Sequence, residues 1–208
     1  MTLASVERAA ICDEFETAGP DRPTLCTGWN TRDLLAHLLV RERQPWVVPG
    51  MLIPALSPIV DRATAGYATT PWPEMIDELR AGPPPWSPFR VGKVDEFGNG
   101  AEFFVHHEDV RRGEPGWEPR PVDPVRDAQL WAALTRMGGM LYRGSPVGVV
   151  LRRPSGEQHV IKTGPGLVVV VGEPSELLLH AFGRTAARVE LAGDQADLDA
   201  LAGATRRF

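Results

Sequence analysis

The feature that most constrains the fold is a change of periodicity near Gly144. Before it, apolar residues recur at helical spacing, with glycines and prolines between the helical segments. After it come β-branched runs, such as GLVVVVG at 166–172, separated by Ser-Gly and Gly-Pro-Gly turns. The pattern therefore predicts an α+β chain, with a helical bundle over residues 1–143 and a small α+β domain over residues 144–208.

The helical part has recognisable starts and stops. Asn30 or Thr31 can cap a helix, with Asp33 placed favourably in its first turn, and Gly113 suits the position just after a helix end. One long stretch is interpreted as a helix interrupted by prolines. The predicted helices cover residues 3–17, 31–44, 50–81 (interrupted), 99–112 and 124–142.

The C-terminal part combines strands and helices. Three β-branched runs between residues 147 and 172 predict three strands joined as hairpins. The segment EPSELLLHAFGR predicts a helix with Pro174 in its first turn, and RVELAG predicts a fourth strand. A closing helix follows, capped by Asp194.

Composition excludes several classes of protein. The chain has 208 residues, of which 43% are hydrophobic and 24% charged, a balance typical of globular rather than disordered proteins. The net charge of −5 gives no basic surface for nucleic acid or an anionic membrane. No apolar run approaches the ~20 residues that span a bilayer. Two cysteines and no secretory signal region predict a cytoplasmic protein.

A possible metal site begins with Glu102 and His106. Their spacing of four residues places both side chains on one face of the predicted helix, and Asp109 returns to that face. Phe103 and Val105 flank this line, which favours an interior position, where a carboxylate and an imidazole need a partner or a cation. The alternative is an ordinary glutamate–histidine hydrogen bond on a solvated helix face.

The helix over 31–44 offers a second histidine. Beside its apolar arc lies a single polar stripe, which runs through Asn30, Asp33, His37, Arg41 and Gln44. This stripe is either the solvent face, which the sequence alone favours, or the lining of a polar cavity. Together with Glu102 and His106, His37 would complete three protein ligands and leave a free coordination position, as in an open zinc site.

These segments resemble a known family. The stretch LCTGWNTRDLLAHLLVRE, followed by EFFVHHEDVRRG, resembles the metal-binding domain of the mycothiol-dependent maleylpyruvate isomerase family, which belongs to the DinB-like four-helix bundles. GEPSELLLHAFGR and VELAGD resemble the smaller C-terminal domain of that family. The resemblance implies that His37, Glu102 and His106 ligate a divalent metal, with zinc as the expected ion.

The resemblance also implies a chemistry. The metal would activate the sulfur of an external thiol, mycothiol, and the thiolate would attack a small electrophile in a transfer or an isomerisation. The arginine-rich, lysine-poor composition indicates a GC-rich genome, which agrees with mycothiol because that thiol belongs to actinobacteria. Two other classes stay open: a non-catalytic bundle that binds a metal or a small molecule, and a metal-dependent hydrolase. Monomer and homodimer are both possible.

Several residues are candidates for supporting roles. Asp33 or Asp109 would orient a ligand histidine, and Arg41 would hold a carboxylate of the substrate or the thiol. Arg184 would close the site from the C-terminal domain. For each, the alternative is an ordinary surface charge.

Other residues are expected to be structural. Cys26 has no evident base beside it in the sequence and is interpreted as a small buried residue rather than a nucleophile. His159 and His180 have no partners at ligand spacing.

Overall fold

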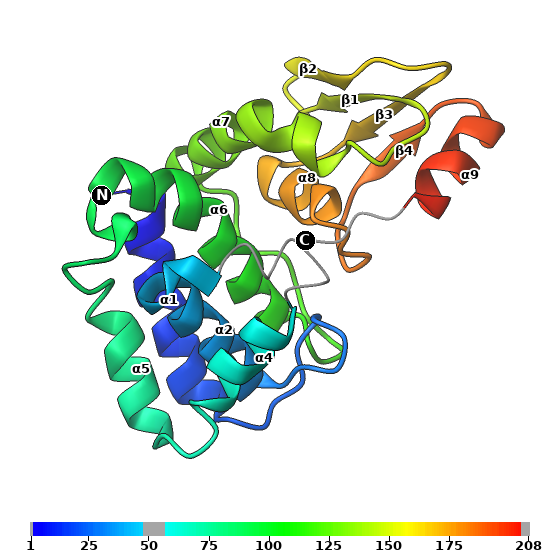
Figure 1. Cartoon of the computed structure of the whole chain (residues 1–208). Helices are drawn as coiled ribbons and strands as arrows, with labels where there is room; N and C mark the ends of the chain where they lie inside the picture. Colours follow the sequence, from blue (N-terminus) through cyan, green and yellow to red (C-terminus); the bar gives the residue numbers. More distant parts are fainter. Residues whose placement is uncertain (1, 48–56, 205–208) are drawn as a thin grey trace. The chain divides into compact units, whose positions relative to one another are not determined.

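The chain forms two compact units, Met1–Glu118 and Pro119–Phe208. The computed structural model describes residues 2–47 and 57–204 (Figure 1). The predicted domain boundary at 143/144 lies later than the division between these units, because helix α7 (Pro124–Leu141) packs against α8 (Pro174–Ala181) and strand β2 (Gln158–Lys162). As a division into domains, 1–143 and 144–208 stays a prediction.

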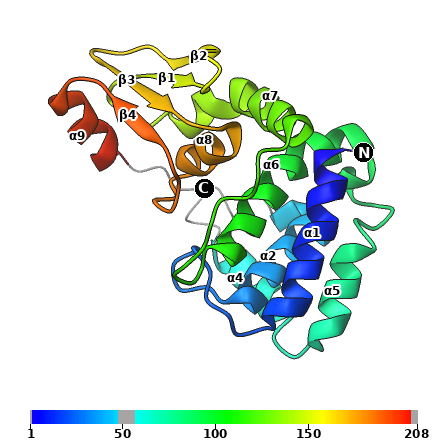
Figure 2. The same cartoon turned by 180° about the vertical axis from the view of Figure 1, so that it is seen from behind.

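The first unit is helical. Helix α1 lies beside α6, and α1 and α2 both pack against α5 (Figures 1 and 2). As predicted, the described residues between 31 and 112 contain no strand. The interrupted helix predicted over 50–81 corresponds to α4 and α5, while residues 48–56 lie outside the described residues. The helices are α1 (Leu3–Ala18), α2 (Thr31–Arg43), α4 (Ser57–Ala65), α5 (Trp72–Arg80) and α6 (Gly92–Arg111), with short 3₁₀ turns at Pro45–Val47 and Pro88–Arg90.

Local signals explain where α2 begins and what it buries. The Asn30 side chain accepts a hydrogen bond from the backbone N–H of Asp33, and the Asp33 carboxylate accepts one from the N–H of Asn30. This reciprocal cap satisfies two backbone donors at the helix start. The apolar arc of α2, including Leu34, Leu35 and Leu38, is fully buried in one core with residues of α1, α5 and α6. The cap and the arc together fix which way His37 faces.

Helix α6 begins at Gly92, earlier than the predicted start at residue 99. Two glycines that look like helix breakers in the sequence lie inside the helix because other parts of the fold approach them closely. A Cβ atom on Gly98 would lie 2.7 Å from the ring of Phe89, and one on Gly100 would lie 3.4 Å from Leu3. Packing therefore outweighs the low helix propensity of glycine.

The second unit contains a four-stranded sheet with the order β2-β1-β3-β4. Strand β1 (Gly148–Arg152) forms the predicted hairpin with β2, but β3 (Leu167–Val171) pairs with β1 in parallel. The prediction of three strands in successive hairpins is therefore wrong for β3. Within β3, Val168 and Val170 are buried, while Leu167 is exposed and Val169 and Val171 are partly exposed, so the valine run is buried mainly on one face.

Close backbone contacts explain how the chain crosses from β2 to β3. A Cβ atom on Gly164 would lie 2.8 Å from the backbone nitrogen of Gly148, and one on Gly148 would lie 2.9 Å from the carbonyl oxygen of Gly166. The turn therefore passes the start of β1 at a distance that admits no side chain. Strand β4 (Glu190–Ala192) runs antiparallel to β3, and the closing helix is α9 (Gln195–Gly203).

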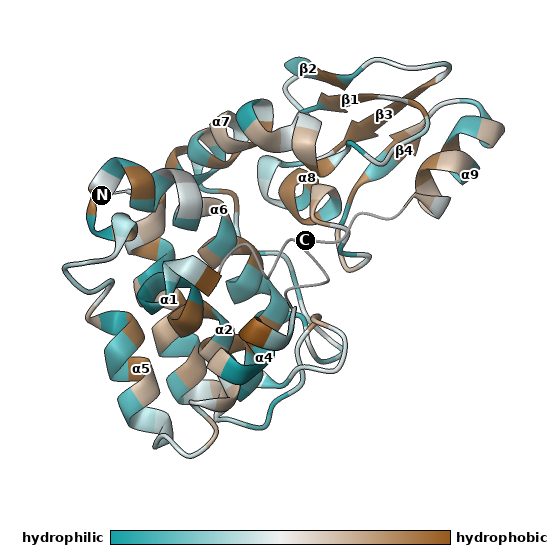
Figure 3. Ribbon diagram, viewed as in Figure 1, coloured by the Kyte–Doolittle hydropathy of each residue, from teal (hydrophilic) through white to brown (hydrophobic). Residues whose placement is uncertain are grey.

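The apolar residues of the second unit gather on its central strands. Val149, Leu151, Val168 and Val170 are fully buried, and Figure 3 shows β1 and β3 as strongly hydrophobic strands. The helix α8 contributes a buried row of leucines. No helix within the described residues combines the length and the apolar character needed to cross a bilayer. The α+β fold class predicted from the sequence is confirmed.

Candidate metal centre

The two predicted helix faces meet in the first unit. His37 of α2 lies opposite Glu102 and His106 of α6, and the three candidate ligand atoms all lie within 4.8 Å of one another. Glu102 Oε1 is 3.6 Å from His37 Nε2 and 3.3 Å from His106 Nε2. The imidazole rings of the two histidines meet edge to face, with centroids 5.2 Å apart. Residues 65 positions apart in the sequence therefore form one donor set.

This donor set has the dimensions that a metal ion needs. A tetrahedral ion with bonds of about 2.0–2.1 Å separates its ligand atoms by about 3.4 Å, close to both measured separations. His37 is only 9% exposed, and its Nε2 atom is buried without a hydrogen bond to any described residue. A buried nitrogen of this kind is costly unless something binds it. The residues present therefore fit a divalent cation.

At His37 and Arg41, the polar stripe of α2 lines this site instead of facing solvent. The sequence alone favoured the solvent face, and that interpretation is wrong for His37, because α6 covers it with its own polar line. Near the start of the helix, Asp33 is exposed, and its carboxylate caps the helix. Of the two predicted orienting carboxylates, Asp109 is the one whose oxygen lies within hydrogen-bond distance of a ligand histidine.

Arg41 extends the site into a buried polar network. Its Nε atom is 3.7 Å from Glu102 Oε1, and its other nitrogens donate to the side-chain oxygen of Asn99 and to a backbone carbonyl of α6. Asn99 in turn donates to Glu42 at 2.8 Å, and Glu42 receives both terminal nitrogens of Arg8 at 2.6 Å. The carboxylate that Arg41 faces in this structure is thus a protein carboxylate, while its predicted role toward a substrate stays a prediction.

The surroundings give the three candidate ligands different protonation preferences. Burial lowers the pKa of His37 below its ordinary value. Burial alone would raise the pKa of Glu102, but the charge of Arg41, the hydrogen bond from His106 and the nearby His37 imidazole hold it well below its usual range. Burial opposes a charge on His106 as well, yet hydrogen bonds to Asp109 and Glu102 raise its pKa well above the usual range. The pair therefore favours an anionic Glu102 beside a protonated His106.

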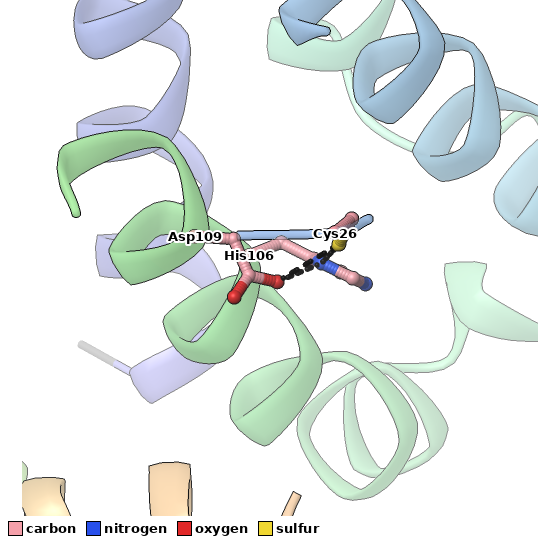
Figure 4. A group of neighbouring side chains, drawn as sticks. All are labelled: Cys26, His106 and Asp109. Carbon is pink, nitrogen blue, oxygen red and sulfur yellow. Dashed lines mark hydrogen bonds and ion pairs between the residues drawn. The ribbon is translucent and has the colours of Figure 1, made fainter. Parts of the chain in front are cut away.

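A second group of donors lies behind His106. Its Nδ1 atom is 2.9 Å from Asp109 Oδ2, and the Cys26 thiol donates to the same oxygen at 3.2 Å (Figure 4). Asp109 is completely buried. The sequence predicted Asp109 on this face, but it gave no sign that Cys26 lies here, because a loop residue has no periodicity to follow.

The remaining candidates have other partners or belong to the second unit. His107 points to the other side of α6, where Nδ1 is 3.2 Å from the buried Glu7 carboxylate. Arg184 belongs to the second unit, where it donates to the carbonyl oxygen of Phe182. His180 is buried there, with Nδ1 2.7 Å from the hydroxyl of Tyr142, and His159 is exposed on β2. The buried contact with Tyr142 is consistent with the structural role predicted for His180.

Comparison with known proteins agrees with the geometry. A family model described as the mycothiol maleylpyruvate isomerase N-terminal domain matches residues 2–85. The resemblance to the mycothiol-dependent maleylpyruvate isomerase family, noted from the sequence, is thereby confirmed. The matched region contains His37 but ends before Glu102 and His106. No curated protein sequence matches the chain.

Two solved structures share the fold. A crystal structure of the mycothiol-dependent maleylpyruvate isomerase superposes with a TM-score of 0.59 at 16% sequence identity, and a histidine-to-alanine mutant of that enzyme superposes with a TM-score of 0.62 at 15% identity. Each comparison covers 91% of this chain and 90% of the other. At this identity the likeness shows the fold, and it extends over both units.

Proposed function

We propose that this protein is a metal- and thiol-dependent isomerase or transferase, with mycothiol as the external thiol. His37, Glu102 and His106 would hold the metal. A divalent ion held there would keep a coordination position for the sulfur of the thiol and would lower its pKa enough to make it a nucleophile at neutral pH. The observation that carries the proposal is the three-residue donor set with its buried, unbonded His37 nitrogen.

The chain's own residues prepare the donor set. Asp109 accepts the Nδ1 hydrogen of His106, which orients the ring so that Nε2 faces Glu102 and His37. Arg41 provides a positive charge beside Glu102 and keeps this carboxylate ionised. Both preparations act before any thiol or substrate arrives, so the site does not have to reorganise on binding.

The substrate class follows from the family. The solved relatives are named as maleylpyruvate isomerases, and we infer that this chain likewise acts on a small unsaturated acid or a comparable electrophile. Addition of a thiolate to such a double bond permits rotation, and loss of the thiolate then gives the isomer. If the thiol adduct is instead released, the protein is a transferase. The expected metal is zinc, and the expected compartment is the cytoplasm.

Cobalt spectroscopy tests whether an external sulfur reaches the metal. We expect millimolar mycothiol to produce a sulfur-to-cobalt charge-transfer band in the cobalt-substituted protein, because sulfur is a good donor for the free position. Cys26→Ala at saturating cobalt is the matched control, since its band must persist if the sulfur comes from outside. An unchanged spectrum with mycothiol would overturn the proposal, and turnover of an ester without thiol would indicate a hydrolase.

Metal binding should release a proton from the chain. Near neutral pH we expect about one proton to leave per metal bound, because His106 must lose its Nε2 hydrogen while His37 and Glu102 are already deprotonated. Affinity should therefore fall as the pH is lowered through the raised pKa of His106. Calorimetric zinc titrations in buffers with different ionisation heats measure the count. Binding without proton release near neutral pH would contradict this order of pKa values.

A further inference from the structure

The loop between residues 23 and 30 is fixed against the end of α6. The backbone N–H of Leu25 donates to the carbonyl oxygen of Asp109 at 3.0 Å, and the N–H of Trp29 donates to the carbonyl oxygen of Cys26 at 2.9 Å. A Cβ atom on Gly113 would lie 2.0 Å from the carbonyl oxygen of Pro23, so the loop and the helix end touch through their backbones. The loop is thus placed by main-chain contacts that do not depend on its side chains.

This placement brings two loop side chains to the two candidate ligand histidines. The ring of Trp29 lies against His37, with centroids 5.2 Å apart. The Cys26 sulfur lies 3.9 Å from His106 Nδ1 and 3.2 Å from Asp109 Oδ2 (Figure 4). This one loop therefore contacts both histidine sides of the donor set.

The contact of Cys26 with Asp109 has a definite direction. An ionised carboxylate only accepts hydrogen bonds, so the thiol hydrogen and the Nδ1 hydrogen of His106 both point to Oδ2. Two donors on one buried oxygen restrict rotation of the carboxylate more than one donor does. With Oδ2 held, Nδ1 of His106 keeps its hydrogen, and Nε2 faces His37 and Glu102, ready to offer its lone pair to a metal once its own hydrogen has left.

We propose that Cys26 is a positioning residue of the metal centre, acting through Asp109 on the orientation and tautomer of His106. The thiol contributes as a hydrogen-bond donor, and the chemistry of the external sulfur does not pass through it. This inference rests on the proposed function only in treating His106 as a ligand. It does not require that any thiol substrate bind.

The test compares a variant that keeps the donor with one that removes it. Cys26→Ser retains an O–H donor, whereas Cys26→Ala retains neither donor nor sulfur. We expect the alanine variant to bind zinc about three- to tenfold more weakly, below the full effect of a direct partner of a metal ligand. The serine variant should bind zinc within about twofold of the parent, because its O–H is similar in size to the cysteine S–H and donates the same hydrogen bond to Asp109.

A double-mutant cycle shows whether the effect passes through Asp109. In an Asp109→Asn background, Cys26→Ala should cause no further loss of zinc affinity, because the carboxylate that it orients is already gone. Thermal unfolding of each metal-free variant separates this from loss of packing. Equal weakening by serine and alanine, or additive losses in the cycle, would overturn the proposal, as would unchanged affinity in the alanine variant.

The metal-free protein gives a second readout. Above the raised pKa of His106, the ¹⁵N ring signals should show hydrogen on Nδ1 in the parent and in Cys26→Ser, and a mixture of tautomers in Cys26→Ala. An unchanged tautomer in the alanine variant would overturn the proposal even if zinc binding proved weak in the parent. Failure of the proposed function is separate, since it appears as a missing charge-transfer band with mycothiol in the parent protein.

Discussion

His37→Ala is expected to lower the affinity for a divalent metal by at least about tenfold. His37 contributes the one buried nitrogen of the donor set that no described residue satisfies, and its removal leaves two ligands on a single helix. Loss of an outer partner of a ligand already costs about 10–100-fold, and loss of the ligand itself should cost no less. Elemental analysis after equilibrium dialysis against limiting zinc measures the effect.

His159→Ala provides the matched control for this experiment. It removes a histidine of the same kind from an exposed position on β2, in the other unit of the chain. Its zinc content should equal that of the parent, which excludes a general loss of surface binding. Full occupancy in His37→Ala would instead mean that the metal lies elsewhere, and the ligand assignment would fail together with the function built on it.

Glu42→Ala is expected to lower the free energy of unfolding by about 2–3 kcal/mol, because Asp95 still faces Arg8 and the loss stays below the usual cost of an uncompensated buried charge. The Glu42 side chain is 2% exposed and receives both terminal nitrogens of Arg8, whose side chain is 10% exposed. Asn99 also donates to Glu42. The substitution therefore removes an acceptor that Arg8 and Asn99 share, and Asp95 Oδ1 remains as a side-chain acceptor for both.

Denaturant titration, followed by a probe in the first unit, measures this loss. Asp13→Ala is the matched control, since it also removes a carboxylate from an arginine, but this side chain is 69% exposed and the cost should stay below about 1 kcal/mol. The double replacement Arg8→Met with Glu42→Leu should recover part of the loss, because it removes both buried charges of the pair and Asp95 keeps Asn99 as a donor. Equal losses of unfolding free energy in Glu42→Ala and Asp13→Ala would show that the buried ion pair stabilises the fold no more than an exposed one.

The sequence predicted the parts of the site that follow helical spacing. The four-residue interval between Glu102 and His106 was sufficient to place them on one face of α6, and the cap at Asn30 was sufficient to start α2. The burial of His37 was not predictable in this way. It depends on α6 covering the polar stripe of α2, and one helix does not reveal which of its faces another helix will cover.

Two other features depend on contacts between distant segments. The ion pair between Arg8 and Glu42 joins α1 to α2. Because the two residues lie on different helices, helical spacing in the sequence does not predict their pairing. The parallel pairing of β3 with β1 depends on a turn that passes the start of β1 at Gly148 and Gly164. A glycine in the sequence is consistent with another segment approaching its backbone closely, but it does not identify that segment.

The contact between Gly113 and Pro23 gives a sequence pattern by which other chains with this centre can be recognised. Gly113 follows the candidate ligands in the pattern Glu-x3-His-x6-Gly, and its backbone does not have the left-handed φ that usually explains a glycine after a helix. What excludes a side chain is the carbonyl oxygen of Pro23, 2.0 Å from where a Cβ would stand. A homologue with a larger residue at this place must carry its 23–30 loop away from the helix end, and its histidines would then lack both the thiol and the indole. The glycine thus separates chains that share only the ligands from chains that share the whole centre.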